Sequence, residues 1–461
     1  MKFGGTSVGN GEHIRHVASL ISNHLNKDYQ MVVVISALKR VTDKLIEASK
    51  EAKSGNRDHV HKLLQKTTKK HVAAARNAIK NKQIRDEVEQ TLKTILDELE
   101  KVLTGIIYLG ELTPKSKDYV LSFGERMSTL IVWGALRDLG LNVQYFTGKD
   151  AGIVTDSNFG EARPLIKVTL HEVKQKVEPL LEKGIIPVVT GYIAANQDGE
   201  ITTLGRGGSD YTATIIAAAL EADEVWIWTD VDGLMTSDPK IVPSTKVISE
   251  LSFQEAIELA IFGAKAMHPK ALEPAMEKEV PVRIRNTFNP QSLGTLIVKE
   301  QKIKAKDVVK GTTIIKNLAL INISGAGMVG TPGTAAKVFD MLGKNNINVL
   351  MISQSASEAN ISFILHRDGL ERAVSTLEIA LLGSGLIREV TAEDDVCVVA
   401  VVGAGMKGTP GVAARLFGAI ARKGLNVRMI AQGSSELNIS FVVKETDGEK
   451  AVRAIHEEFK L

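Results

Sequence analysis

The chain has 461 residues, of which 44% are hydrophobic and 24% are charged, with a formal net charge of +3. This length predicts two or three domains, and the composition is typical of a soluble globular protein. No block of Lys and Arg is interleaved with aromatic residues, so we expect neither nucleic acid nor a membrane as a partner. There is no signal peptide and no apolar run of about 18 residues, which predicts a cytoplasmic protein. The single cysteine, Cys397, lies in an apolar run and is expected to be buried in a strand.

The chain begins with Lys2-Phe3-Gly4-Gly5-Thr6-Ser7-Val8-Gly9, and helical spacing of apolar residues starts soon afterwards. Glycines let backbone N–H groups approach an anion, and the N-terminus of the following helix adds partial positive charge. Lys2 could reach the same anion. The pattern predicts a phosphate site; the alternative is an ordinary strand-to-helix turn with a solvated Lys2.

This opening resembles the first signature of the aspartate kinases, a branch of the amino acid kinase superfamily. The resemblance implies that Lys2, Phe3, Gly4 and Gly5 contact the nucleotide. It also implies an α/β fold for residues 1–303, a three-layer sandwich with a mainly parallel sheet. Two ACT domains, each a βαββαβ (ferredoxin-like) module, should follow.

The next element is the apolar run Met31–Ile35, which predicts a strand buried on both faces. It ends at Ser36, at the carboxyl edge of the expected sheet, where ligands collect in open α/β folds. Taken alone, Ser36 is a turn residue and Thr42 a helix cap. In aspartate kinases the matching serine and threonine line the active site, and the threonine contacts aspartate.

Residues 56–104 contain neither Gly nor Pro. Apolar residues recur in this segment at helical spacing. We expect a helical insertion without chemistry. Its histidines, His59, His61 and His71, are expected to lie on solvated faces.

The segment Ser122-Phe123-Gly124-Glu125-Arg126 is predicted to open a helix that runs to Leu136. A carboxylate at that position commonly complements the helix dipole. The segment also resembles the Ser-Phe-Gly-Glu motif of the family, which implies that Glu125 faces the amino group of the substrate.

A second glycine corner, Gly205-Arg206-Gly207-Gly208-Ser209-Asp210, joins an expected strand at Ile201–Leu204 to a helix at Tyr211–Leu220. Arg206 can bind a carboxylate or phosphate with two hydrogen bonds, whereas Ser209 or Asp210 could simply cap the helix. The corner resembles the second aspartate kinase signature. The resemblance implies that Arg206, Gly207, Gly208 and Ser209 contact the substrate. Asp210 would orient either Lys2 or Mg²⁺.

Further nucleotide contacts follow the expected strand Val225–Trp228. The resemblance implies five of them: Thr229, Asp230, Met235, Lys240 and Lys265. Two depart from the family pattern, because Lys240 replaces an arginine and Met235 a tyrosine. Without the resemblance, Lys265 would be an ordinary solvated helix lysine.

The last third of the chain is an internal repeat, in which Ile323–Gly333 matches Val401–Gly411 with an offset of 403 − 325 = 78 residues. Each copy predicts strand, glycine loop, helix, two strands and helix. Copy one occupies 317–393 and ends in a short strand at Leu386–Thr391. Copy two occupies 394–461 together with 304–316, because Val308–Ile315 is expected to complete its separate sheet.

The repeated Gly-Ala-Gly-Met-Val-Gly also satisfies the dinucleotide fingerprint G-x-G-x-x-G. A dinucleotide site, however, expects an acidic residue at the end of the second strand. Here those strands end in Ser353-Gln354 and Ala431-Gln432. The pattern instead resembles paired ACT domains, which implies an effector site at Gly327, Met328, Gly330, Asn348, Ile352 and Gln354.

The resemblance therefore implies a monofunctional aspartate kinase that uses ATP and Mg²⁺ to phosphorylate the β-carboxylate of L-aspartate. This would be the first step of lysine, threonine and methionine biosynthesis. Feedback inhibition would act through the ACT domains, with threonine the favoured effector, and the expected assembly is a homodimer or larger. The alternatives are another amino acid kinase, acting on glutamate, acetylglutamate, carbamate or a nucleoside monophosphate, and a catalytically inactive effector sensor.

Overall fold

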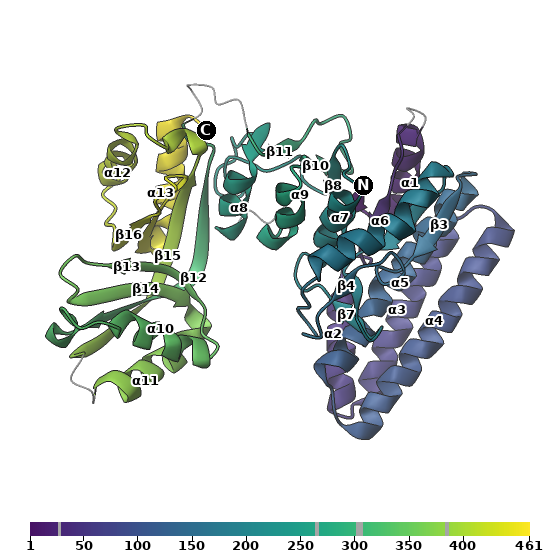
Figure 1. Ribbon diagram of the computed structural model, residues 1–461, viewed down its shortest axis with the longest axis horizontal. Coiled ribbons are helices and arrows are strands. Elements are labelled where there is room, and N and C mark those ends of the chain that lie inside the picture. Colours follow the sequence, from purple (N-terminus) through teal and green to yellow (C-terminus); the bar gives the residue numbers. More distant parts are fainter. Residues whose placement is uncertain (26–28, 263–266, 301–307, 383–386) are drawn as a thin grey trace. The chain divides into compact units, whose positions relative to one another are not determined.

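The computed structural model describes residues 1–25, 29–262, 267–300, 308–382 and 387–461 (Figure 1). The chain divides into two compact units. The first comprises Met1–Leu234, Ser249–Phe253 and Ala266–Glu300, and the second comprises Met235–Ile248, Gln254–Lys265 and Gln301–Leu461. Two short stretches that precede residue 303 therefore pack with the C-terminal repeats. Lys265, an expected nucleotide contact, lies outside the described residues.

The first unit is built on an eight-stranded sheet with the order β3-β5-β2-β1-β8-β10-β11-β9. All neighbouring pairs are parallel except β10 with β11. The strands are β1 (Lys2–Phe3), β2 (Val33–Ile35), β3 (Val143–Phe146), β5 (Ile186–Thr190), β8 (Val225–Thr229), β9 (Glu250–Ser252), β10 (Val282–Asn286) and β11 (Thr295–Val298). The expected mainly parallel α/β sheet is confirmed. Because β1 is central, Lys2 lies opposite both Val34 and Ile227 in the middle of the sheet.

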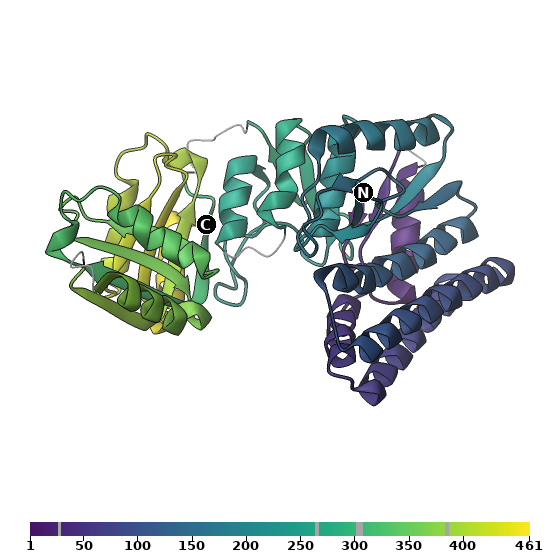
Figure 2. The ribbon, with the colours of Figure 1, turned by 60° about the horizontal axis from the view of Figure 1, so that its bottom comes forward.

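Helices cover both faces of this sheet, which gives the expected three layers (Figure 2). The longest buried helix, α5, packs on β2, β3 and β5, and α7 packs on β1, β2 and β8. The helices are α1 (Gly11–Leu25), α2 (Val41–Lys53), α3 (Arg57–Ala78), α4 (Lys82–Leu109), α5 (Pro114–Asp138), α6 (Ile166–Glu182), α7 (Gly208–Ala219) and α9 (Glu273–Glu277). A small second sheet is formed by β4 (Val154–Thr155), β6 (Ile193–Asn196) and β7 (Ile201–Thr203).

The helical insertion is a pair of long helices, α3 and α4, that pack against one another and on α5. The expectation for one of its histidines is wrong. His71 has no exposed surface, its Nδ1 lies 2.8 Å from the Thr67 carbonyl oxygen, and burial lowers its pKa to about 4. Leu63, Thr67 and His71 follow one another at intervals of four residues and lie on the buried face of α3. This helical spacing could have predicted that His71 is buried.

The helix that carries Glu125 begins earlier than predicted. α5 starts at Pro114, and Thr113 caps it by accepting a hydrogen bond from the Ser116 N–H. Glu125 is therefore in the middle of a helix and receives no help from its N-terminal dipole. The overlooked signal is Thr-Pro, a cap residue followed by the residue favoured at the first helical position.

The second unit contains one six-stranded antiparallel sheet, with the order β13-β14-β12-β15-β17-β16. Its strands are β12 (Gly311–Ser324), β13 (Val349–Gln354), β14 (Asn360–His366), β15 (Glu389–Val402), β16 (Met429–Gln432) and β17 (Asn438–Lys444). Its helices are α8 (Phe253–Ile261), α10 (Thr334–Lys344), α11 (Leu370–Leu381), α12 (Val412–Arg422) and α13 (Glu445–Phe459). Cys397 is buried in β15, and burial raises the pKa of its thiol to about 12.

The expectation that Val308–Ile315 completes the sheet of the second repeat is confirmed for Gly311–Ile315, but the two repeats share one continuous sheet instead of forming two. Gly311–Ile315 pair with β15 in the region of the second repeat, and the same strand continues through Leu318–Ser324 in the first. β15 likewise runs through both repeats, so the expected short strand ending at Thr391 is only its beginning. Each of the two long strands thus contributes one segment to each copy. A register shift between Ile315 and Leu318 marks the crossing from one copy to the next.

Candidate active site

The first glycine corner joins β1 to α1 and lies close to the loop after β2. A Cβ on Gly5 would lie 2.8 Å from the Ala37 carbonyl oxygen, which explains the need for glycine. The Gly5 carbonyl oxygen accepts a hydrogen bond from the Lys39 N–H at 3.0 Å. Below the corner, the buried hydroxyls of Ser7 and Thr287 lie 2.6 Å apart. The corner is therefore fixed to the loop after β2 and to the carboxyl end of β10.

The second glycine corner joins β7 to α7. Gly205 and Gly207 adopt left-handed backbone conformations, with φ of 72° and 74°. A Cβ on Gly207 would also lie 2.5 Å from the His268 Cβ, so a side chain there would meet both strain and a clash. Arg206 lies between these two glycines and is exposed to solvent. Among the described residues it makes no ion pair, which leaves its guanidinium available to a ligand.

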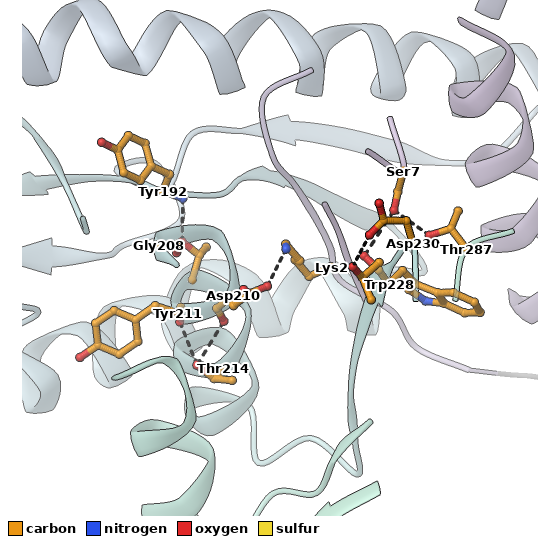
Figure 3. Close-up of polar contacts among 12 residues, drawn as sticks. Lys2, Ser7, Tyr192, Gly208, Asp210, Tyr211, Thr214, Trp228, Asp230 and Thr287 are labelled. Carbon is orange, nitrogen blue, oxygen red and sulfur yellow. Dashed lines mark hydrogen bonds and ion pairs between the residues drawn. The ribbon is translucent and has the colours of Figure 1, made fainter. Parts of the chain in front are cut away.

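An ion pair links the two corners. Lys2 Nζ lies 2.5 Å from Asp210 Oδ1, and both side chains are only about a tenth exposed. Figure 3 shows the two side chains pointing toward one another, Lys2 from β1 and Asp210 from the first turn of α7. Of the two roles left open for Asp210, orienting Lys2 is the one that this contact supports.

Not every expected backbone donor is available. The Gly4 N–H is donated to the Trp228 carbonyl oxygen at 3.1 Å, and the Gly208 N–H to that of Gly205 at 3.0 Å. These two N–H groups are therefore used within the protein in this structure and are not free to bind an anion. The N–H groups of Gly5 and Ser209 remain as candidate donors.

Glu125 is a buried carboxyl group on α5, 4% exposed. Its Oε1 accepts a hydrogen bond from the Ala37 N–H at 3.2 Å, and within the described residues its Oε2 has no hydrogen-bond partner. Burial raises the pKa of Glu125 to about 8, because the low-dielectric surroundings disfavour the charged form. The hydrogen bond from Ala37 and the nearby charge of Lys2 act in the opposite direction and do not outweigh burial.

These elements enclose one cavity of about 520 Å³. Nine residues expected to meet substrate, nucleotide or phosphate line it together: Lys2, Gly5, Ser36, Thr42, Glu125, Arg206, Gly207, Gly208 and Ser209. Asp210 lines it as well. Residues from remote parts of the sequence thus share one space, large enough for an amino acid beside a phosphate group.

The other expected nucleotide contacts that the structure describes do not line this cavity. Phe3 has no exposed surface and stacks on Trp228 with ring centroids 5.9 Å apart, so its side chain belongs to the core. Thr229 and Asp230 follow at the carboxyl end of β8, and Thr229 Oγ1 donates to Asp230 Oδ1 at 3.2 Å. Met235 and Lys240 belong to the second unit.

Several cavity residues were missed at the sequence level. Six of them lie beyond the carboxyl edge of the main sheet or on α5, and Glu161 lies in the loop after β4: Lys39, Arg40, Asp43, Lys117, Asp118, Glu161 and Tyr192. Tyr192 comes two residues after the end of the strand Ile186–Thr190. Ligands bind at the carboxyl ends of parallel strands, so this position could have identified Tyr192 as a cavity residue. Asp118 lies seven residues before Glu125, two turns away on the same helix face.

The second unit has a cavity of about 320 Å³ at the glycine loop of the first repeat. Three of the expected effector residues line it, namely Met328, Gly330 and Gln354. The other three, Gly327, Asn348 and Ile352, do not. Glu358 also lines it, and Glu358 Oε2 accepts a hydrogen bond from the Gly330 N–H at 2.9 Å.

Within the ranges given above, no three His, Cys, Asp or Glu side chains are grouped as they would be to hold a metal ion. No helix in the same ranges has both the length and the apolar character needed to cross a membrane.

Comparison with known proteins matches both units. The sequence model of the amino acid kinase family matches residues 1–286, and that of an ACT domain matches residues 321–381 and 399–459. Aspartokinase 1, chloroplastic, of Arabidopsis thaliana is 33% identical over 100% of this chain and 79% of its own length. The bifunctional aspartokinase/homoserine dehydrogenase 2, chloroplastic, of the same plant is 35% identical over 100% of this chain. The chain spans about half the length of such bifunctional relatives, 50% in this case.

Solved structures agree with these matches. E. coli aspartokinase III in complex with aspartate and ADP, in its R-state, superposes with a TM-score of 0.84 at 29% identity, covering 100% of this chain and 99% of that one. The same enzyme in complex with lysine and aspartate, in its T-state, gives a TM-score of 0.79 at 29% identity, covering 99% of this chain and 98% of that one.

Proposed function

The chain belongs to the aspartokinases, within the amino acid kinase family, and on that premise we propose that it transfers the γ-phosphoryl group of ATP to the β-carboxylate of L-aspartate. One observation carries the proposal: Lys2, Glu125 and Arg206, three residues suited to the three charged groups of such a reaction, line one cavity. The product would be 4-phospho-L-aspartate, an intermediate for lysine, threonine and methionine.

The amino acid would be held at both ends of its backbone. Arg206 is exposed within the cavity wall and would bind the α-carboxylate with two hydrogen bonds. Glu125 would accept the ammonium group, which favours the ionised form of a carboxyl group whose pKa burial has raised. Binding would therefore release a proton from Glu125 near neutral pH. Ser36, Thr42 and the Ser209 N–H would complete the contacts.

Chemistry at this site needs alignment and charge neutralisation more than proton transfer. The attacking β-carboxylate has an ordinary pKa of about 3.9 and is ionised at neutral pH, so no general base is required. Lys2 would neutralise the phosphoryl group during its transfer. Asp210 would hold the ammonium group of Lys2 in place. Backbone N–H groups of Gly5 and Ser209 would add fixed donors.

The nucleotide is proposed to lie along the carboxyl end of β8, near Thr229 and Asp230. Met235, Lys240 and Lys265 are proposed as its further contacts. Mg²⁺ in kinases is bound mainly through substrate phosphates and waters with one or two protein carboxylates. Because Asp210 Oδ1 is paired with Lys2, only the other oxygen of this carboxylate would be a donor for Mg²⁺. When bound, Mg²⁺ would neutralise charge on the phosphates.

Regulation is proposed to act through the glycine loop of the first repeat. The cavity there, with Met328, Gly330 and Gln354 in its wall, has the size of an amino acid site. Gly327, Asn348 and Ile352 are proposed as outer contacts. We propose threonine as the effector; lysine, named in the E. coli T-state complex, is the competing candidate. A cytoplasmic homodimer or larger assembly is proposed as the working form.

The deciding experiment is ADP release by the purified chain with ATP and Mg²⁺. L-Aspartate should support turnover, whereas glutamate, acetylglutamate and carbamate should not. ADP release that does not depend on aspartate, or that follows one of the other acceptors, would refute the proposal. Adding threonine or lysine to the same assay identifies the effector.

A further inference from the structure

One buried carboxylate beside the cavity has no role in the mechanism above. Asp118, on α5, has no exposed surface. Its Oδ2 accepts hydrogen bonds from the Gly160 N–H at 2.9 Å and the Thr203 N–H at 3.0 Å. Its Oδ1 accepts a third from Thr203 Oγ1 at 2.8 Å. Two segments outside the helix are therefore fastened to α5 through a single side chain.

Both segments lead directly to the cavity. Thr203 is the last residue of β7, and Arg206 follows three residues later. Gly160 lies in the loop after β4 and lines the cavity, as does Asp118 itself. The Ala162 N–H closes the arrangement by donating to the Thr203 carbonyl oxygen at 2.9 Å. The start of the second glycine corner is thus tied to α5.

The same helix also carries Glu125. Seven residues separate Asp118 from Glu125, so the two side chains leave α5 on one face, two turns apart. Both line the cavity. α5 therefore sets the position of Glu125 by its own geometry, and the position of the Arg206 corner through the hydrogen bonds of Asp118.

We propose that Asp118 is a positioning residue for the amino acid substrate, which fixes the separation between Glu125 and Arg206. The proposal rests on the proposed function, in which these two groups bind the ammonium and α-carboxylate groups. Those groups are attached to one carbon atom, so their separation is fixed and the protein must match it. Misplacement of about 1 Å at such a site can reduce catalytic efficiency by about 10²-fold. Because the first glycine corner makes no hydrogen bond to Asp118, nucleotide binding should not depend on it.

Burial alone could explain a carboxylate with three donors, so the test needs a control that separates structure from positioning. Glu98 of α4 provides it. This carboxylate also holds α5, accepting from Arg126 Nη2 at 2.7 Å and from the Tyr119 hydroxyl, and it does not line the cavity. Loss of Glu98 should weaken the attachment of α5 without moving Arg206 relative to Glu125.

The experiment compares Asp118→Asn with Glu98→Gln and the unmodified chain, measuring KM for aspartate, KM for ATP, kcat and melting temperature. Asp118→Asn keeps the volume but replaces one acceptor oxygen by an NH₂ group facing N–H donors. We expect KM for aspartate to rise about tenfold or more and KM for ATP to stay within about twofold. Glu98→Gln should lower the melting temperature and leave KM for aspartate within about twofold. Equal rises in both KM values, or an equal effect of Glu98→Gln, would overturn the proposal.

A second pair of variants decides the matter if Asp118→Asn does not fold. Thr203→Val removes only the hydroxyl hydrogen bond, whereas Thr203→Ser retains it. KM for aspartate should rise about threefold in the first and stay near that of the unmodified chain in the second. Identical KM values in the two would refute the role of Asp118. Aspartate-dependent turnover of the unmodified chain tests the proposed function separately, because the inference about Asp118 is judged only on ratios between variants.

Discussion

The cavity of the first unit and the cavity of the repeat unit are lined by different kinds of residue. The first has charged side chains of both signs, including Lys2, Glu125, Arg206 and Asp210. Of the described residues that line the second, one is charged, Glu358, and the others contribute backbone, methyl, hydroxyl and amide groups. The first suits the movement of a highly charged phosphoryl group, and the second suits recognition of a small ligand. Substitutions in one cavity should therefore change turnover, and substitutions in the other should change inhibition.

The largest effect should come from Lys2→Ala. It removes the cation expected to neutralise the phosphoryl group and leaves Asp210 unpaired and largely buried. We expect kcat to fall by about 10²- to 10³-fold, the usual cost of losing one preorganised charge-stabilising group. Steady-state ADP release at saturating aspartate and ATP measures it, and circular dichroism verifies the fold.

The residual turnover of Lys2→Ala should remain as sensitive to the effector as that of the unmodified chain. Loss of inhibition together with activity would show that the two cavities are not functionally separate. A kcat within about threefold of normal would remove Lys2 from the phosphoryl site.

Arg206→Ala should act mainly on aspartate binding. Its guanidinium is exposed in the cavity wall and unpaired within the described residues, so its removal should cost ligand contacts more than stability. We expect KM for aspartate to rise by about 10²-fold, with KM for ATP little changed. Arg206→Lys, which keeps the charge but loses the two-pronged geometry, should give an intermediate KM. An unchanged KM for aspartate in Arg206→Ala would place the α-carboxylate elsewhere.

These two predictions depend on residues that the sequence made visible. Lys2, Gly5 and the Arg206 corner were identified because glycine pairs and their flanking charges have a local chemical signature, and the resemblance to a known family named their roles. Glu125 was identified as a site residue although its helix was given the wrong start. A motif identifies a residue by its neighbours in the sequence, so the identification does not depend on where the helix begins.

The parts that the sequence did not reveal depend on tertiary contacts. Asp118 is one carboxylate among many until Gly160 and Thr203 are brought to it by folding. The Gly4 N–H is a phosphate donor in the sequence pattern, but the Trp228 carbonyl oxygen accepts it in the structure. The internal repeat correctly predicts two modules. It does not reveal that β12 and β15 are long enough to run through both copies, because the repeat pattern does not mark where a strand ends.

The pH dependence of aspartate binding should be moderate. Burial raises the pKa of Glu125 to about 8, so in the empty site this group is mostly protonated at pH 7 and mostly ionised at pH 8.5 or above. Because the ammonium group of aspartate binds the ionised form, KM for aspartate should fall by about tenfold as pH rises from 7 to 8.5.

Glu125→Gln supplies the control for this pH effect. It cannot ionise, so its KM for aspartate should be high and independent of pH over the same range. A pH profile of the unmodified chain that is equally flat would show that Glu125 does not meet the ammonium group. None of the described residues that line the cavity of the repeat unit is a buried acid, so the inhibition constant should change less with pH than KM does.

The smallest effect should come from the repeat unit, where the two copies can be compared directly. Gln354 of the first copy lines the cavity of the repeat unit, and Gln432 is its counterpart 78 residues later. Gln354→Ala should raise the threonine concentration for half-inhibition about five- to tenfold, because one amide hydrogen bond to a ligand is worth about 1 kcal/mol. Gln432→Ala should change it less than twofold, and kcat without effector should be unchanged in both.

We expect the two glutamine substitutions to differ in their effect on inhibition because a helix, α8, already contacts the second copy. There the Ala404 N–H donates to Glu255 Oε1 of α8 at 2.6 Å, and Asn438 Nδ2 donates to Glu258 Oε2 at 2.9 Å. Because α8 contacts the glycine loop and Asn438 of the second copy, we expect the effector to bind the first copy. Equal losses of inhibition in Gln354→Ala and Gln432→Ala would show that both copies bind effector. Point substitution is preferable to truncation here, because residues 235–248 pack with the repeats and would lose their support.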